Sequence, residues 1–168
     1  MRALHPHPVI PLAAEPLSSA AFAPYGQVIW PQGDGGDWQP GDAELHLNQG
    51  PPRLYLMQLP ARGLRFRELA AHQLVSQCLG VMEPHSWQIA VAPASHPADQ
   101  PIDAATGLRA FTVPPRCILK LHPGTWHAGP LFAHPGELVF CNLELRDTNS
   151  QDRLTLPLSE GQEAEIRP

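Results

Sequence analysis

The segment HPGTWH places two histidines and a tryptophan, His122, Trp126 and His127, around a Pro-Gly turn. Histidine gives or takes a proton near neutral pH because its unperturbed pKa is about 6.5, and its ring is also the commonest metal ligand. These residue types predict a site of proton transfer, with His122 as the principal acid or base. His127 could instead hydrogen-bond backbone carbonyls at the turn. Trp126 could be a packing residue whose indole N–H is its one polar group.

A second candidate pair is Glu68 and His72, which are four residues apart. That offset places two side chains together on a helix, and it also places them on the same face of a strand. We expect them to assist proton transfer, with Gln77 nearby as a donor to a carbonyl oxygen. The alternatives are an outward-facing charge for Glu68 and a hydrogen-bonded structural role for His72.

Two arginines, Arg109 and Arg53, are the candidates for holding a substrate carboxylate. A guanidinium grips a carboxylate through a planar two-point fork that neutral side chains cannot reproduce. Arg53 follows two prolines and could equally be solvated.

The spacing of the histidines gives no positive support for a metal site. A His-x-His pair occurs only at His5 and His7, in a proline-rich N-terminal segment. Ligands could still converge in space from His72, His122 and His127 or Glu68. We expect no cofactor and no obligatory metal, and a divalent ion stays an open alternative.

Composition excludes several classes of function. The chain has 168 residues and a formal net charge of −5, so it lacks the basic footprint that nucleic-acid binding needs. No apolar run approaches the ~20 residues of a membrane span. The three cysteines, Cys78, Cys117 and Cys141, are too widely spaced for a disulfide framework or a CxxC metal pair. We expect a cytoplasmic protein with buried thiols.

The chain has 21 prolines, which are kept out of helix interiors and central strands, so long helices are not expected. Short apolar runs bounded by Gly and Pro predict an antiparallel sandwich or small barrel. A short helix is expected over 16–22, capped by Ser18 or Ser19, and loops over 33–42 and 93–107. The first two strands are expected to pair across the turn at 60–63. The predicted strands are 54–59, 64–69, 87–92, 108–113, 117–121, 137–145 and 154–158.

A small closed barrel fills its narrow end with side chains and keeps its mouth for a ligand, so polar residues from several strands can meet there. We expect a single domain over 1–168, with an N-terminal extension at 1–16 and a C-terminal tail at 159–168. Uncovered sheet edges invite pairing, which favours a homodimer.

Several elements occur in an order that resembles the ureidoglycolate lyase family, formerly called ureidoglycolate hydrolase. The likeness runs from about residue 17 to 145, and its most specific part is the His-x-Gly-x-Trp-His element. The matching elements are Phe22-Ala23-Pro24-Tyr25-Gly26, Asn48-Gln49-Gly50 with Arg53, Glu68-Leu69 with His72 and Ser76-Gln77, Ala90-Val91-Ala92-Pro93, Arg109-Ala110-Phe111, and His122-Pro123-Gly124-Thr125-Trp126-His127.

The resemblance implies an all-β, cupin-type double-stranded β-helix (a jelly-roll-like barrel) with a few short helices, commonly a homodimer. It also implies a carbon–nitrogen lyase of the amidine-lyase type, which splits (S)-ureidoglycolate into glyoxylate and urea in purine breakdown. In that reaction a base takes the hydroxyl proton, an acid protonates the departing nitrogen, and a cation holds the carboxylate. The expected catalytic residues are His122, His72 and Glu68, and the expected substrate-binding residues are Gln77, Arg109, Arg53, Trp126 and His127.

The chain departs from the family pattern at three places. Ala128-Gly129 replaces a second histidine after the tryptophan, Ala71 stands where the family has an arginine, and 142–149 differ from the family's Gly-rich segment. A lost arginine weakens the grip on an anionic substrate. The alternative hypothesis is therefore a divergent cupin that binds a small carboxylate or a protein partner without turnover.

Overall fold

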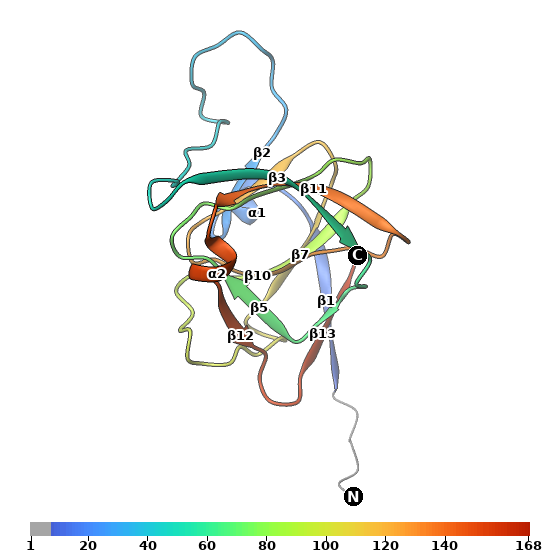
Figure 1. Cartoon of the computed structure of the whole chain (residues 1–168). Coiled ribbons are helices and arrows are strands. Elements are labelled where there is room, and N and C mark those ends of the chain that lie inside the picture. Colours follow the sequence, from blue (N-terminus) through green and yellow to red (C-terminus); the bar gives the residue numbers. More distant parts are fainter. Residues whose placement is uncertain (1–7) are drawn as a thin grey trace, which may run out of the picture.

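The computed structural model describes residues 8–168 and contains two β-sheets and two single-turn helices (Figure 1). The eight-stranded sheet curls into a half-barrel and has the order β12-β5-β10-β7-β8-β1-β13-β4, and the five-stranded sheet has the order β2-β9-β6-β11-β3. The elements are β1 (Val9–Pro16), α1 (Ser19–Phe22), β2 (Gly26–Ile29), β3 (Pro52–Pro60), β4 (Arg65–Phe66), β5 (Glu68–Ala71), β6 (Cys78–Val81), β7 (Trp87–Ala92), β8 (Arg109–Val113), β9 (Ile118–Leu121), β10 (Trp126–Leu131), β11 (Glu137–Leu145), α2 (Thr148–Gln151), β12 (Leu154–Pro157) and β13 (Glu163–Arg167).

The all-β prediction is confirmed. The strands expected from apolar runs form close to their predicted bounds, except that the expected strand 64–69 is divided at Arg67 into β4 and β5, which pair with different strands. All residues of β7 are buried, whereas β11 alternates in burial along its length because only one of its faces is fully covered. The short helix at the start also forms as α1, and the Ser18 hydroxyl accepts a hydrogen bond from the backbone N–H of Ala21 at 3.1 Å. Residues 33–42 and 93–107 lie outside the named strands, as expected.

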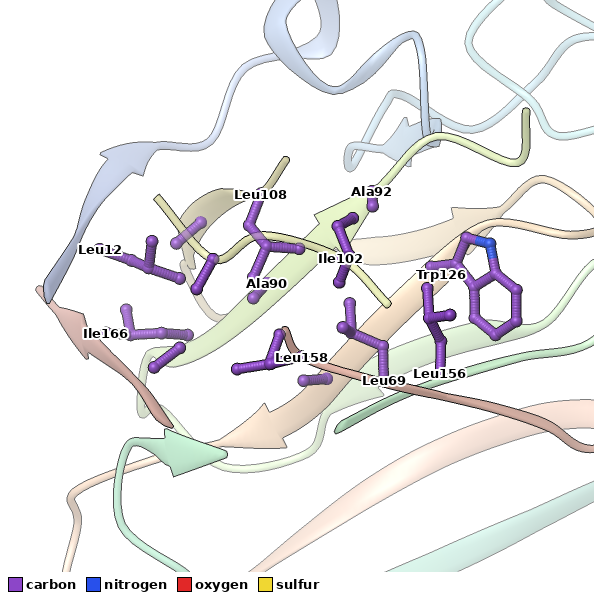
Figure 2. Close-up of a cluster of buried hydrophobic side chains, with 14 of the residues drawn as sticks. Leu12, Leu69, Ala90, Ala92, Ile102, Leu108, Trp126, Leu156, Leu158 and Ile166 are labelled. Carbon is purple, nitrogen blue, oxygen red and sulfur yellow. The ribbon is translucent and has the colours of Figure 1, made fainter. Parts of the chain in front are cut away.

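The larger sheet has a buried apolar cluster on each face, because successive side chains of a strand point to opposite sides. Ile89 and Val91 of β7 belong to the cluster between the two sheets, together with Phe111 and Phe140. Ala90 and Ala92 belong to the second cluster, to which Ile102, Leu108 and the strands β1, β12 and β13 contribute (Figure 2). In this second cluster, small side chains lie opposite one another across four strands, in the row Ala14, Ala110, Ala90 and Ala128.

The expected pairing across the turn at 60–63 is wrong. β3 pairs with β11 over its whole length in the smaller sheet, whereas β4 pairs with β13 and β5 pairs with β10 and β12 in the larger sheet. The reason is that β3 finds a nine-residue partner in β11, while the chain crosses from one sheet to the other at 61–64. A polar turn shows where the chain turns but not which strands pair.

The expected N-terminal extension and C-terminal tail each contain a strand, β1 and β13. β1 lies between β8 and β13 and runs parallel to both, and Figure 1 shows it beside β13. Leu12, Ala164 and Ile166 are buried in the second cluster, and this burial explains why both ends join the sheet. Residues 1–7 of the expected extension lie outside the described residues.

Candidate functional site

A cavity of about 480 Å³ lies between the two sheets, and polar side chains line it from both sides. The larger sheet contributes residues of β5 and β10, and the smaller sheet contributes residues of β3 and β11, with Gln77 just before β6. The cavity therefore lies between the two sheets, as the apolar cluster does, but polar as well as apolar side chains line it. The residues used below are Tyr55, Arg62, Arg65, Arg67, Glu68, His72, Gln77, His127, Asn142, Glu144, Asn149 and Arg153.

Two buried histidines meet at this cavity. His72 directly follows β5, and His127 lies on β10 opposite Ala70 of β5, so pairing of these two strands brings the rings together. The ring centroids are 5.6 Å apart. Gly124 allows the tight turn before β10, because it adopts φ +84°, a conformation that L side chains rarely take.

Backbone carbonyls fix the orientation of both rings. Nδ1 of His72 lies 2.7 Å from the carbonyl oxygen of Asp152, and Nδ1 of His127 lies 3.2 Å from the carbonyl oxygen of Thr125. A carbonyl oxygen only accepts hydrogen bonds, so each Nδ1 carries the proton and donates it. In a neutral ring this leaves Nε2 unprotonated, which is the form a general base requires.

His127 is neutral at pH 7. Its pKa is lowered from 6.5 to about 4, mainly because burial disfavours the charged ring; the charges of His72 and Arg153 also lower it, and the hydrogen bond to the Thr125 carbonyl acts in the opposite direction. The influence of His72 follows from the short distance between the rings, since two like charges so close together are unfavourable. The pair therefore disfavours a state in which both rings are charged.

The opposite wall is built around Glu144, which is 1% exposed and lies on β11. Nη2 of Arg53 lies 3.0 Å from one of its carboxylate oxygens, and the guanidinium of Arg53 also stacks over the Tyr55 ring. The amides of Gln77 and Asn142 each donate to the other carboxylate oxygen at 3.3 Å. Arg53 is thus tied to a buried carboxylate of the protein and is not free to hold one from a substrate.

Arginines from the larger sheet and the segments next to it line the cavity. Arg65 and Arg67 form ion pairs with Glu163 and Glu165 of β13. Arg62 and Arg153 form no ion pair with any of residues 8–168, and the charge of Arg153 is felt at His127. This excess of positive charge suits an anionic ligand.

The structure brings together four of the residues predicted from the sequence: Glu68, His72, Gln77 and His127 all line the cavity. Glu68 begins β5 and His72 directly follows its end, and both residues line the cavity. Glu68 is exposed, whereas the other three are buried.

His122, Trp126 and Arg109 are not among the cavity-lining residues. Nε2 of half-buried His122 lies 3.2 Å from the Ala23 carbonyl, because the turn between β9 and β10 packs on the segment after α1. Trp126 alternates with His127 along β10, so it points to the second apolar cluster, and its indole N–H donates to the His96 carbonyl at 3.1 Å.

Arg109 forms a two-point ion pair with Glu15 of β1. The distances from Nη2 and Nε to the two carboxylate oxygens are 2.6 and 2.9 Å, and Nη1 also donates to the Ala21 carbonyl at 3.2 Å. This pair raises the pKa of Arg109 and lowers that of Glu15. The guanidinium therefore joins β8 to β1 and to α1, and the two N–H groups that could bind a substrate carboxylate already bind Glu15.

Sequence reasoning missed Asn142 and Glu144 of β11, and also Arg62 and Arg153. The alternation along β11 contained a signal for the first two, since they continue the inward series of Leu138 and Phe140 at steps of two residues. Polar side chains at inward positions of a strand indicate a site or a buried network. For Arg153, which lies between α2 and β12, the sequence contained no comparable signal.

Residues 8–168 contain no group of three or more His, Cys, Asp or Glu side chains placed to hold a metal ion. In the same part of the chain, no helix has the length and apolar character needed to cross a membrane.

The sequence of this chain matches no protein-family model and no curated protein sequence. The likeness to the ureidoglycolate lyase family therefore rests on the order of short motifs alone.

Proposed function

We propose that this chain is a carbon–nitrogen lyase that converts ureidoglycolate, or a closely related 2-hydroxy-2-amido acid, to glyoxylate and urea. The observation that carries the proposal is the meeting of His72 and His127 in a cavity with an excess of arginines. Both rings are oriented by backbone carbonyls, and at least one of them is neutral at pH 7. This arrangement suits proton transfer on a small anion.

In the proposed reaction, Nε2 of His127 takes the proton of the substrate hydroxyl as the new carbonyl of glyoxylate forms. The carbon–nitrogen bond breaks, its electron pair stays on the nitrogen, and protonated His72 supplies the proton that completes urea. Transfer of a proton from His127 back to His72 restores the starting state. His127 thereby takes the role that sequence reasoning assigned to His122.

The substrate carboxylate is assigned to Arg153 and Arg62. Both line the cavity, and the charge of Arg153 reaches His127. Arg109 and Arg53 have no part in this assignment because their guanidinium groups already bind Glu15 and Glu144. Glu68 lies at the exposed edge of the cavity, where it can exchange protons between water and the histidine pair.

The test is release of glyoxylate from ureidoglycolate by purified, urease-free protein, compared with the spontaneous reaction. His127→Gln and His72→Gln should each lower kcat by about 10²–10⁴-fold, which is the range for positioned acid and base groups. His85→Gln serves as a matched control, because His85 stacks on His134 and does not line the cavity. Loss of activity in His122→Gln, with activity kept in His127→Gln, would refute the assignment.

Binding without turnover defines the alternative function. If glyoxylate or oxalate binds in a calorimetric titration and ureidoglycolate is not cleaved above the spontaneous rate, the lyase proposal fails. The chain is then a carboxylate-binding module.

The proposal includes a cupin-type, jelly-roll-like barrel that acts as a homodimer in the cytoplasm. Two sheets with a cavity between them support the architecture, and three free cysteines support a reducing compartment. The exposed Leu54 and Leu56 on the edge strand β3 support a partner subunit at that edge.

A further inference from the structure

Glu144 binds donors on both of its carboxylate oxygens. Arg53 and Asn149 approach one oxygen at 3.0 and 3.4 Å, and Gln77 and Asn142 approach the other at 3.3 Å each. Every one of these contacts is a donation to the carboxylate, since a carboxylate only accepts. Glu144 is therefore a fixed acceptor in the wall of the cavity.

This arrangement decides which end of the Gln77 amide is left without a partner. Nε2 of Gln77 donates to Glu144 and also to Oδ1 of Asn142 at 3.3 Å. Asn142 cannot offer its own N–H groups in exchange, because they donate to the Tyr55 hydroxyl at 3.0 Å and to Glu144. Oε1 of Gln77 therefore points away from this network.

Oε1 of Gln77 is buried, and it has no hydrogen-bond partner among residues 8–168. Gln77 is 7% exposed and lines the same cavity as His72 and His127. A buried acceptor without a partner is unfavourable in the empty site, so a ligand that supplies a donor there gains affinity over one that does not.

We propose that Glu144 is a positioning residue that makes Gln77 a hydrogen-bond acceptor, and that the site thereby selects small carboxylates carrying an amide or ureido N–H. This inference rests on the proposed function for the location of the site, and it adds the group by which a substrate is recognised. It reverses the role expected from the sequence, in which Gln77 donates to a carbonyl oxygen.

Two isosteric ligands test the inference without any reaction. N-carbamoylglycine carries a carboxylate and a ureido group, and levulinate has the same heavy-atom skeleton with carbon in place of both nitrogens. Neither has the hydroxyl group that the lyase reaction needs. By calorimetry, we expect the protein to bind N-carbamoylglycine roughly tenfold more tightly than levulinate, as one buried hydrogen bond allows.

Two variants should remove this preference. Gln77→Leu deletes the acceptor, and Glu144→Gln provides a side chain that can donate to Oε1 of Gln77 and so lets the amide turn round. In both variants the ratio of the two affinities should fall to about one, while levulinate still binds. Glu144→Gln should also lower the melting temperature, because it removes the buried charge that pairs with Arg53, so both affinities are measured well below that temperature. Retained binding of levulinate separates a loss of recognition from a general loss of structure.

The chain offers a matched control pair of the same residue types. Gln58 on β3 donates to Glu137 on β11, and both are exposed on the outside of the smaller sheet. Gln58→Leu and Glu137→Gln should keep the tenfold preference. Equal affinity of the parent protein for both ligands, no binding of either, or a preference kept in Glu144→Gln would overturn the inference. If ureidoglycolate is not cleaved but the preference is found, the lyase proposal fails and this inference stands.

Discussion

The low pKa of His127 makes stability depend on pH in a way that one substitution should remove. The folded protein holds this pKa at about 4, against 6.5 in the unfolded chain. Between these values the unfolded chain binds more protons, so the free energy of unfolding falls as the pH falls from about 6.5 towards 4. At 1.36 kcal/mol per pKa unit, the whole effect is about 3 kcal/mol, of which about 2 kcal/mol is lost by about pH 5.

The assay is urea denaturation of the parent protein and of His127→Gln at about pH 7.5 and about pH 5. Glutamine does not titrate, so the parent should lose about 2 kcal/mol more than the variant between these conditions. His122→Gln controls for the removal of a histidine at the same turn. Equal losses in the parent and in His127→Gln would refute the assignment of a buried, neutral ring, and with it the proposed base.

Three further outcomes are expected. Arg109→Ala should lower the free energy of unfolding by no more than about 1 kcal/mol in urea denaturation, because its ion pair with Glu15 is partly solvated. It should leave the affinity for N-carbamoylglycine unchanged. A lower affinity would show that Arg109 binds the substrate carboxylate, as the sequence predicted. Phe140→Ala should cost about 3–5 kcal/mol in the same measurement, since the ring is fully buried between the sheets, and a cost below 1 kcal/mol would contradict that packing. Cys78 and Cys117 should resist iodoacetamide at about pH 8 until the protein unfolds, because burial raises the pKa of each thiol to about 11, and rapid alkylation of the native protein would show otherwise.

Local sequence signals were sufficient for the strands that carry continuous apolar runs. β7 and β11 were predictable because Gly and Pro bound them and because β-prone residues fill them. β10 was missed because Gly129 and Pro130 interrupt it, at the point where its register with β7 shifts. β1 was missed because it contains Pro11 and Pro16, and only contacts with distant strands show that both fit in the sheet.

The same division between local and distant information applies to the site. The even offset between Glu68 and His72 predicted that the two side chains lie on the same side of the chain, and both residues line the cavity although His72 lies just past the end of β5. The choice between His122 and His127 was not local. It depends on the strand β5 that pairs with β10 at His127, and on the carbonyl of Ala23 that faces His122. No spacing within a turn contains that information.

The position of β1 inside the larger sheet matters for anyone who shortens this chain. Deleting its first sixteen residues would remove the strand that links β13 and β4 to β8, rather than trim a loose end. β13 supplies the glutamates that hold Arg65 and Arg67 beside the cavity. Such a truncation would therefore free these two arginines to move, although it removes no residue of the cavity. Loss of ligand affinity in a shortened protein would then report a damaged scaffold, although no residue that touches the ligand had been altered.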